Sequence, residues 1–289
     1  MSCEPWAIDP LKGRAIVEFL AFAASGGVYS PEERAEKIGS EKARQIRERS
    51  GSTAIIPIHG VMSQRIGMME KTSGGVSSDD VRQAVNAAVA DESVKTILLH
   101  IDSPGGSLYG TAELAAAVRA ARDVKPVIAM VDSVAASAAY WIASQASEIT
   151  MTPGGDVGSI GVYSMHEDLS KALEAEGVKP TLVYAGEHKV EGNPFEPLSD
   201  TAKQQLQARV DSAYGDFVAA VAAGRGVTSK AVENSYGQGR TLSARDALSA
   251  GMVDRIATFD ETLARYARPQ SNQQNYTRRA KLAAAKAAI

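Results

Sequence analysis

The sequence has little cysteine and no excess of charge of one sign. Cys3 is its one cysteine among 289 residues, which excludes an intramolecular disulfide and a cysteine-based zinc cluster. The 31 Lys and Arg residues against 34 Asp and Glu give a formal net charge of −3. Such a balance provides no general attraction to nucleic acid or to an anionic membrane, and we expect neither as a partner.

Long hydrophobic runs are also missing. The longest candidate, residues 15–28, is interrupted by Glu18 and by Gly26-Gly27, and it is too short to cross a bilayer. The first residues carry no basic stretch ahead of an apolar one, as a secretory signal would require. We therefore expect a cytoplasmic protein without a membrane anchor.

Motifs for cofactors and metals are lacking as well. The sequence contains neither a P-loop nor a His-Glu-x-x-His pattern. Asp102 and Asp132 each follow an expected strand, but no third ligand stands at a suitable spacing. We expect no cofactor and no bound metal.

What is present is the composition of a folded protein with one or two domains. Hydrophobic residues make up 44% of the chain and charged residues 22%, which are ordinary values for a globular protein. We divide the chain into a helical N-terminal arm (1–52), a main domain (53–257), and a C-terminal helix with a flexible basic tail (258–289).

The main domain alternates between apolar strands and amphipathic helices. Continuous apolar runs that alternate with helices are typical of parallel βαβ units covered on both faces, and thus of the α/β class. The expected strands are 53–58, 95–101, 126–131, 160–163 and 181–184; the expected helices are 79–90, 109–121, 138–146, 169–176 and 199–223, the last capped by Ser199.

Two turns in this domain are candidates for a catalytic or binding site. Asp102-Ser103-Pro104-Gly105-Gly106 connects a strand to a helix, and backbone N–H groups in such a turn can point at one anion; a plain Pro-Gly turn has the same sequence. Ser137 follows another strand and opens a helix among small alanines, where N–H groups converge. A helix cap or a packed hydroxyl is the alternative for Ser137.

A third feature is Lys189, in the glycine-containing loop 185–192. Lysines in such loops are usually solvated. A lysine amine that is buried beside a serine loses its proton more readily and can then accept the proton of the hydroxyl. The sequence does not decide between these two interpretations.

Together these motifs resemble peptidase family S49, the signal peptide peptidase A-like serine proteases. The resemblance covers about residues 53–256 and is carried by four motifs in order: Asp102 to Gly106, Ala135 to Tyr140, Gly158-Ser159-Ile160-Gly161-Val162 and Gly186-Glu187-His188-Lys189. The stretch from His188 to Phe195 is most similar to the branch of capsid assembly, or head maturation, proteases of lambda-like tailed phages.

The resemblance implies a ClpP/crotonase-like fold of stacked βαβ units and a Ser–Lys dyad. Ser137 matches the nucleophile, Lys189 the general base, and Ser159 the serine that orients the lysine. Gly106 and Ala138 match the backbone donors of the oxyanion hole. Gly105 and Tyr140 are expected to contact substrate, with Trp141 as a further candidate for the pocket lining. The expected partners are polypeptide substrates, such as a phage scaffold or portal protein, and further copies of the chain in a tetramer or octamer whose active sites are completed between neighbours.

Other readings stay open. His166, with Glu167 and Asp168 beside it, could form a Ser-His-Asp arrangement with Ser137. A cytoplasmic peptidase that clears signal-peptide remnants is a second alternative. A third is a crotonase-like acyl-CoA enzyme, in which the oxyanion amides bind a thioester and Lys189 has no role.

Overall fold

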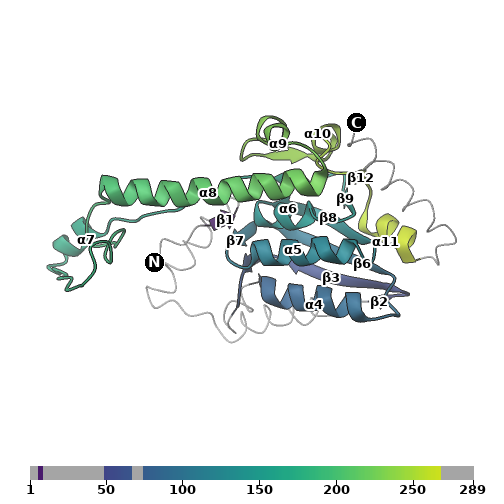
Figure 1. Cartoon of the computed structure of the whole chain (residues 1–289), viewed down its shortest axis with the longest axis horizontal. Helices are drawn as coiled ribbons and strands as arrows, with labels where there is room; N and C mark the ends of the chain where they lie inside the picture. The colour runs from purple at the N-terminus through teal and green to yellow at the C-terminus, as the bar shows by residue number, and fades with distance from the viewer. Residues whose placement is uncertain (1–5, 9–48, 67–73, 268–289) are drawn as a thin grey trace.

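The computed structural model describes residues 6–8, 49–66 and 74–267. Its centre is an eight-stranded sheet in which β3, β6, β8 and β9 run parallel to one another, as does β10 beside the end of β8 (Figure 1). The predicted α/β class with a parallel sheet is thus confirmed. The strands are β2 (Arg49–Ser50), β3 (Thr53–His59), β6 (Thr96–Ser103), β8 (Val127–Ala136), β9 (Glu148–Met151), β10 (Asp156–Gly158), β11 (Thr241–Ser243) and β12 (Arg255–Ile256).

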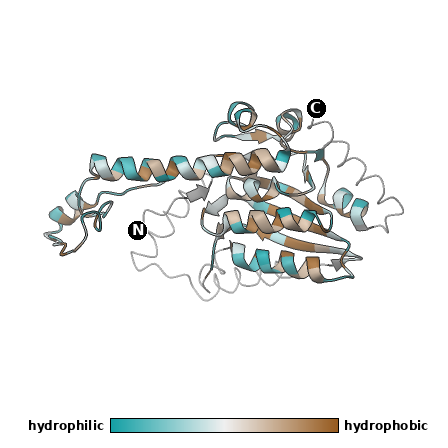
Figure 2. Ribbon diagram, viewed as in Figure 1, coloured by the Kyte–Doolittle hydropathy of each residue, from teal (hydrophilic) through white to brown (hydrophobic). Residues whose placement is uncertain are grey.

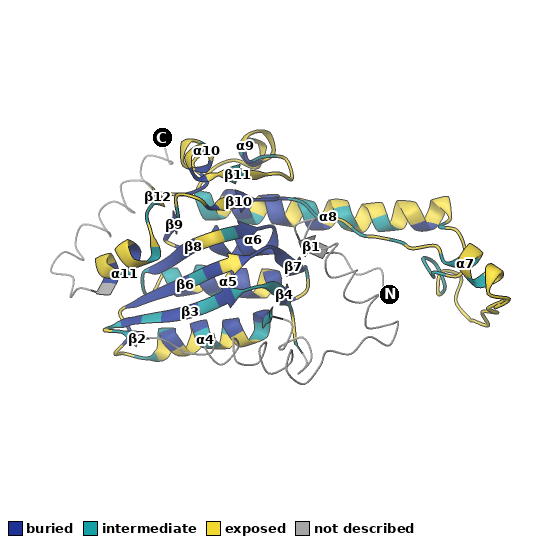
Figure 3. Cartoon of the chain, turned by 180° about the vertical axis from the view of Figure 1, so that it is seen from behind, coloured by how far each residue is buried: buried dark blue, intermediate teal, exposed yellow. Residues whose placement is uncertain are grey.

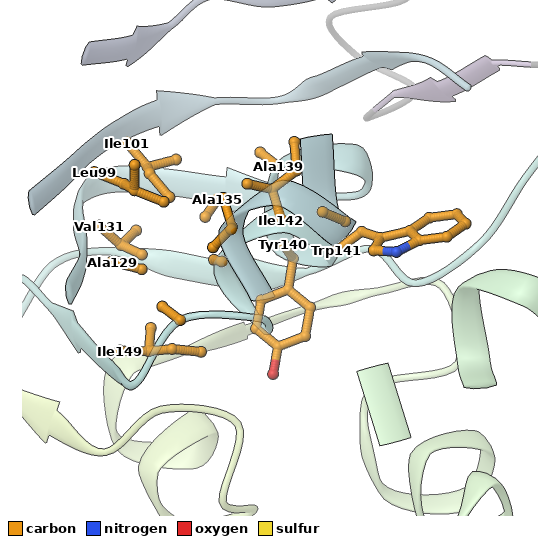
Figure 4. Packing of buried hydrophobic residues seen from close by; sticks show 14 of the residues in the cluster. Leu99, Ile101, Ala129, Val131, Ala135, Ala139, Tyr140, Trp141, Ile142 and Ile149 are labelled. Carbon is orange, nitrogen blue, oxygen red and sulfur yellow. The ribbon is translucent and has the colours of Figure 1, made fainter. Parts of the chain in front are cut away.

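Three helices cover one face of this sheet and form the main core with it (Figures 1 and 4). They are α4 (Ser78–Ala90), α5 (Thr111–Arg122) and α6 (Ala138–Ala143). Figure 2 shows brown, hydrophobic residues along the strands beneath them. On the opposite face, α11 (Phe259–Ala267) packs Phe259 and Leu263 onto a smaller cluster of Ile55, Leu98 and Met130.

A second, smaller sheet lies beside the main one in the strand order β1-β7-β4-β5. Its members are β1 (Trp6–Ile8), β4 (Val61–Ser63), β5 (Gly75–Ser77) and β7 (Gly105–Ser107). β7 begins one residue after Pro104, so the chain passes from β6 of the main sheet into the small sheet without a separate loop. The predicted Pro-Gly turn is therefore the junction between β6 and β7, and its two glycines are the first residues of β7.

The long helix α8 (Asp200–Arg225) links this body to an outlying part of the chain. The Ser199 side chain accepts a hydrogen bond from the Ala202 amide, which confirms the predicted cap. Near its other end α8 buries Phe217, whose ring stacks on Trp141 of α6 at 4.7 Å between centroids. A Cβ on Gly224 would come within 2.3 Å of the Ser144 carbonyl oxygen, so glycine permits the close approach of α8 to α6.

Residues 163–199, which we call the arm, extend away from the body along α8 (Figure 1). The arm contains the short helix α7 (Ser170–Ala175), and nearly all of its residues are exposed or half-buried. The predicted strand 181–184 is wrong: the segment has no strand partner among the described residues of this copy and lies exposed. The predicted strand 160–163 is wrong as well, because the ladder beside β8 is formed earlier, by β10, and leaves a single bridge at Tyr163.

At the chain ends the expectations are met only in part. Within the expected N-terminal arm (1–52), the described residues form strands β1 and β2, and 9–48 lie outside the described residues. At the other end α11 confirms the predicted helix, while the basic tail lies outside the described residues. Between α8 and β12 the chain forms two short helices, α9 (Ser229–Ser235) and α10 (Ala244–Ser249).

Candidate active site

Ser137 occupies a sharp bend between β8 and α6. Its backbone has φ 53° and ψ −122°, a conformation that residues other than glycine rarely adopt. A residue held in such a conformation costs about 1–3 kcal/mol and persists where the surrounding structure enforces it. A bend of this kind between a strand and a helix presents the nucleophilic serine in the α/β-hydrolases.

The Ser137 hydroxyl is not used to cap α6. The helix has no side-chain cap, and among the described residues Oγ makes one hydrogen-bond contact, with the Gly161 carbonyl oxygen at a long 3.5 Å. The residue is nevertheless almost completely buried. The capping interpretation of Ser137 is therefore wrong, and its hydroxyl is engaged only weakly within the described residues.

Ser159 stands beside Ser137 for a simple topological reason. In the parallel ladder of β8 and β10, Ala136 pairs with Gly158, so the next residue of each strand is a serine. The Ser137 amide donates to the Gly158 carbonyl at 2.7 Å, which ties the two strands together at this point. Ser159 is itself buried and has φ 54°. Both serines are thus held in strained backbone at adjoining strand ends.

The glycine turn lies against the same region, because α6 packs on β7. A Cβ on Gly106 would come within 1.9 Å of the Met62 carbonyl oxygen of β4, so only glycine allows this strand contact. The Gly105 amide donates to the Ser103 hydroxyl at 3.2 Å, and that hydroxyl donates to the Gly60 carbonyl. These bonds fix the turn from which the Gly106 backbone is presented.

Lys189 is far from Ser137 in the same copy of the chain. It lies exposed in the arm, in a turn where its amide donates to the Gly186 carbonyl at 3.1 Å. Figure 3 shows the arm as a mostly exposed projection, with α8 between it and the body. A 26-residue helix is about 39 Å long, and α6 contacts the end of α8 opposite the arm. One copy of the chain therefore holds Ser137 and Ser159 together and Lys189 apart.

Two residues expected to line a substrate pocket belong to the core instead. Tyr140 is completely buried, and its hydroxyl donates to the Met252 carbonyl at 2.9 Å (Figure 4). Burial raises the pKa of this phenol, which keeps it neutral. Trp141 is buried against Phe217. In this copy the Tyr140 side chain has no exposed surface for the predicted substrate contact, because it is packed in the core.

The alternative base His166 is also located in the arm. Its Nε2 lies 2.9 Å from the Asn193 carbonyl oxygen, a contact between two arm residues. The neighbouring Asp168 accepts a hydrogen bond from the Ser170 amide, and hydrogen bonds from Ser170 lower the pKa of this carboxyl group. These contacts do not bring a histidine and a carboxylate to Ser137 within one copy.

A polar cluster on β6 and β8 was missed by the sequence analysis. Three residues lie between Val131 and Ala135 of β8, opposite the single residue between Ile101 and Ser103 of β6, so β8 carries a bulge. The bulge is held by the Ser133 hydroxyl, which donates to Asp102, and by His100, whose Nε2 lies 3.3 Å from the Asp132 carboxylate. Because the bulge precedes Ser137 by only a few residues, it determines where β8 delivers the serine.

Within the described ranges, no group of three or more potential ligands is placed to hold a metal ion, and no helix combines the length and apolarity needed to cross a membrane.

Comparison with known proteins gives several relatives at moderate identity. The chain is 30% identical over 276 residues to the capsid assembly protease C of Escherichia phage lambda, covering 90% of this chain and 62% of that protein. It is 34% identical over 225 residues to the head-tail preconnector protein GP5 of Enterobacteria phage P21, covering 78% of this chain and 44% of that protein. Protease 4 of Salmonella typhi is 30% identical over 218 residues, covering 75% of this chain and 34% of that protein.

Among solved structures, a mutant of a membrane-bound stomatin-specific protease matches with a TM-score of 0.45 at 17% identity, covering 75% of this chain and 85% of that one. A mutant ClpP1 from Listeria monocytogenes matches with a TM-score of 0.44 at 15% identity, covering 72% and 94%.

The chain spans about one third to three fifths of the length of the three curated relatives described above. The family model for peptidase family S49 matches residues 119–273. This segment is more than half of the chain and includes Ser137, Ser159 and Lys189. By this match the chain belongs to peptidase family S49.

Proposed function

We propose that the chain is a serine endopeptidase in which Ser137 is the nucleophile and Lys189 of a second copy is the general base. The observation that carries the proposal is that Ser137 and Lys189 lie apart in one copy of the chain. Ser137 is held in strained backbone with a weakly engaged hydroxyl, and Lys189 projects on an exposed arm. An arm that reaches away from its own body can complete the site of a neighbour in a closed oligomer.

The reaction would follow from this geometry. The Lys189 amine takes the proton of Ser137 while Oγ attacks the peptide carbonyl, and the Gly106 and Ala138 amides stabilise the oxyanion. The lysine ammonium then protonates the leaving amine. A water molecule deprotonated by the same lysine releases the acyl group. Ser159, at the strand end beside Ser137, would orient the incoming amine.

Substrate and setting are inferred from the relatives. The similarity to a phage capsid assembly protease points to head assembly, with a scaffold or portal protein as substrate and the host cytoplasm as the place of action. We infer a tetramer or octamer, because each Ser137 then meets the arm of the next copy. Gly105, at the start of β7, would contact the extended substrate next to Gly106.

The test is intact mass spectrometry of wild-type, Ser137→Ala and Lys189→Ala chains after incubation with unfolded casein. Lys179→Ala is the matched control, since Lys179 is an exposed lysine of the same arm. We expect casein fragments from wild type and Lys179→Ala and none from the other two. Cleavage by Lys189→Ala together with its loss in His166→Ala would replace the Ser–Lys mechanism with a histidine-based one.

A further inference from the structure

The strand β7 has two edges, and both are occupied. On one side Met62 of β4 pairs with Gly106 in parallel. On the other side β1 pairs antiparallel, with Ala7 opposite Gly106 and its neighbours Trp6 and Ile8 opposite Ser107 and Gly105. β1 is formed by a segment about 100 residues earlier in the chain, so this pairing is a long-range contact of the backbone with the glycine turn.

We propose that β1 occupies the position of an extended substrate, and that the chain thereby inhibits itself until a polypeptide displaces Trp6–Ile8. The inference rests on the proposed function, in which the Gly106 amide stabilises the oxyanion. A scissile carbonyl that reaches this amide belongs to a peptide that runs along β7. The β4 edge is closed, because not even a Cβ fits between Gly106 and Met62. The edge held by β1 is the one that a substrate strand can use.

The pairing suits a displaceable occupant. β1 has three residues, and a strand added to a sheet edge binds mainly through backbone hydrogen bonds that another extended peptide can reproduce. Two residues beyond β1 the sequence has Pro10, which has no N–H to continue a ladder. The contact is therefore short, and exchange for a longer substrate strand gains hydrogen bonds.

The expected strength of inhibition follows from tethering. A segment tethered to its own binding site acts at an effective concentration of about 1 mM, so a free peptide with a Kd of about 100 µM would correspond to roughly tenfold inhibition in the chain. The peptide affinity and the relief of inhibition are thus linked, and each predicts the other.

The test uses the double variant Ala7→Pro/Ile8→Pro. The N–H groups of adjacent strand residues point to opposite edges of the strand. One of the two prolines therefore removes an N–H directed at β7, whichever of the two residues donates to that strand. Ala7→Ser/Ile8→Val keeps both N–H groups and is the matched control. The first readout is the anisotropy of a labelled peptide of residues 1–12, measured with the proline variant and the control on a Ser137→Ala background, which does not depend on activity. The second is casein cleavage with Ser137 intact.

We expect the peptide to bind the proline variant and to bind the control about tenfold more weakly, and we expect the proline variant to cleave casein about tenfold faster. Equal peptide affinity for both proteins would overturn the inference. So would a proline variant that melts at a lower temperature and cleaves more slowly, because β1 would then be a structural strand.

Two further results separate this inference from the proposed function. If the peptide binds the proline variant but no variant cleaves casein, the exchange of strands is upheld and the peptidase proposal fails. If the proline variant does not fold, hydrogen exchange in the Ser137→Ala chain decides instead. An excess of an extended casein peptide should then accelerate exchange of the amides of residues 6–8, and unchanged exchange would overturn the inference.

Discussion

The body and the arm of this chain are organised in opposite ways. In the body, parallel strands are buried on both faces over much of their length, and Ser137, Ser159 and the glycine turn are fixed by backbone pairing with neighbours in the same chain. In the arm, apolar side chains stand in solvent, and Val183 is 95% exposed. Such exposed apolar groups are typical of a surface that another molecule covers. Under the proposed function, one half of the candidate site is complete within one chain, and the other half would come from a second copy.

The largest difference in stability should appear when one aromatic ring is removed from each region. Phe217→Ala in the body deletes a completely buried ring that stacks on Trp141, and it should lower the free energy of unfolding by about 3–5 kcal/mol. Phe195→Ala in the arm removes a partly exposed ring and should change it by less than about 0.5 kcal/mol. Urea unfolding of both variants measures the difference, and equal effects would remove the distinction between body and arm.

A smaller effect should reveal the backbone strain at Ser137. Ser137→Gly and Ser137→Ala both lose the hydroxyl and, under the proposed function, all cleavage. The glycine variant should be more stable than the alanine variant by about 1 kcal/mol, because glycine accepts the positive φ of 53° without cost. Thermal unfolding of the two variants measures this difference. If alanine were the more stable of the two, the backbone at Ser137 would not be strained.

The smallest effect on folding should accompany a large effect on assembly. Val183→Asp places a charge on the exposed arm, and the free energy of unfolding of a single copy should change by less than about 0.5 kcal/mol. If the arm is covered by a neighbour, sedimentation velocity should show that the variant assembles less than wild type. Val124→Asp, at an exposed valine of the body, is the control that should assemble normally. Unchanged assembly of Val183→Asp would show that this part of the arm is not an interface.

The body was largely predictable because its sequence pattern and its contacts agree. The continuous apolar runs 95–101 and 126–131 lie in β6 and β8, and the Ser199 cap starts α8 as expected. The prediction ended the β8 strand at residue 131, since Asp132 and Ser133 are polar. The strand in fact continues through them, because they form a bulge whose side chains are bonded to Asp102 and His100. Pairing between distant segments of this kind leaves no local signal.

The arm was less predictable for a different reason. The segment Thr181–Tyr184 has the composition of a strand, but a strand requires a partner, and this copy of the chain supplies none for these described residues. Lys189 was a candidate from its motif alone, and the sequence did not show that it lies exposed on an arm away from Ser137 of the same copy. The identity of the candidate residues could be read locally, whereas their meeting place depends on tertiary and quaternary structure.

The most direct test of a shared active site is complementation between two inactive chains. Ser137→Ala and Lys189→Ala are purified, dissociated, mixed in equal amounts and reassembled, and casein cleavage is measured against wild type treated in the same way. If Ser137 of one copy uses Lys189 of another, random mixing gives intact pairs at about one quarter of the sites, and we expect about one quarter of the wild-type rate. A mixture as inactive as either variant alone, despite demonstrated mixed assemblies, would contradict the account, because the two residues would then have to act within one chain.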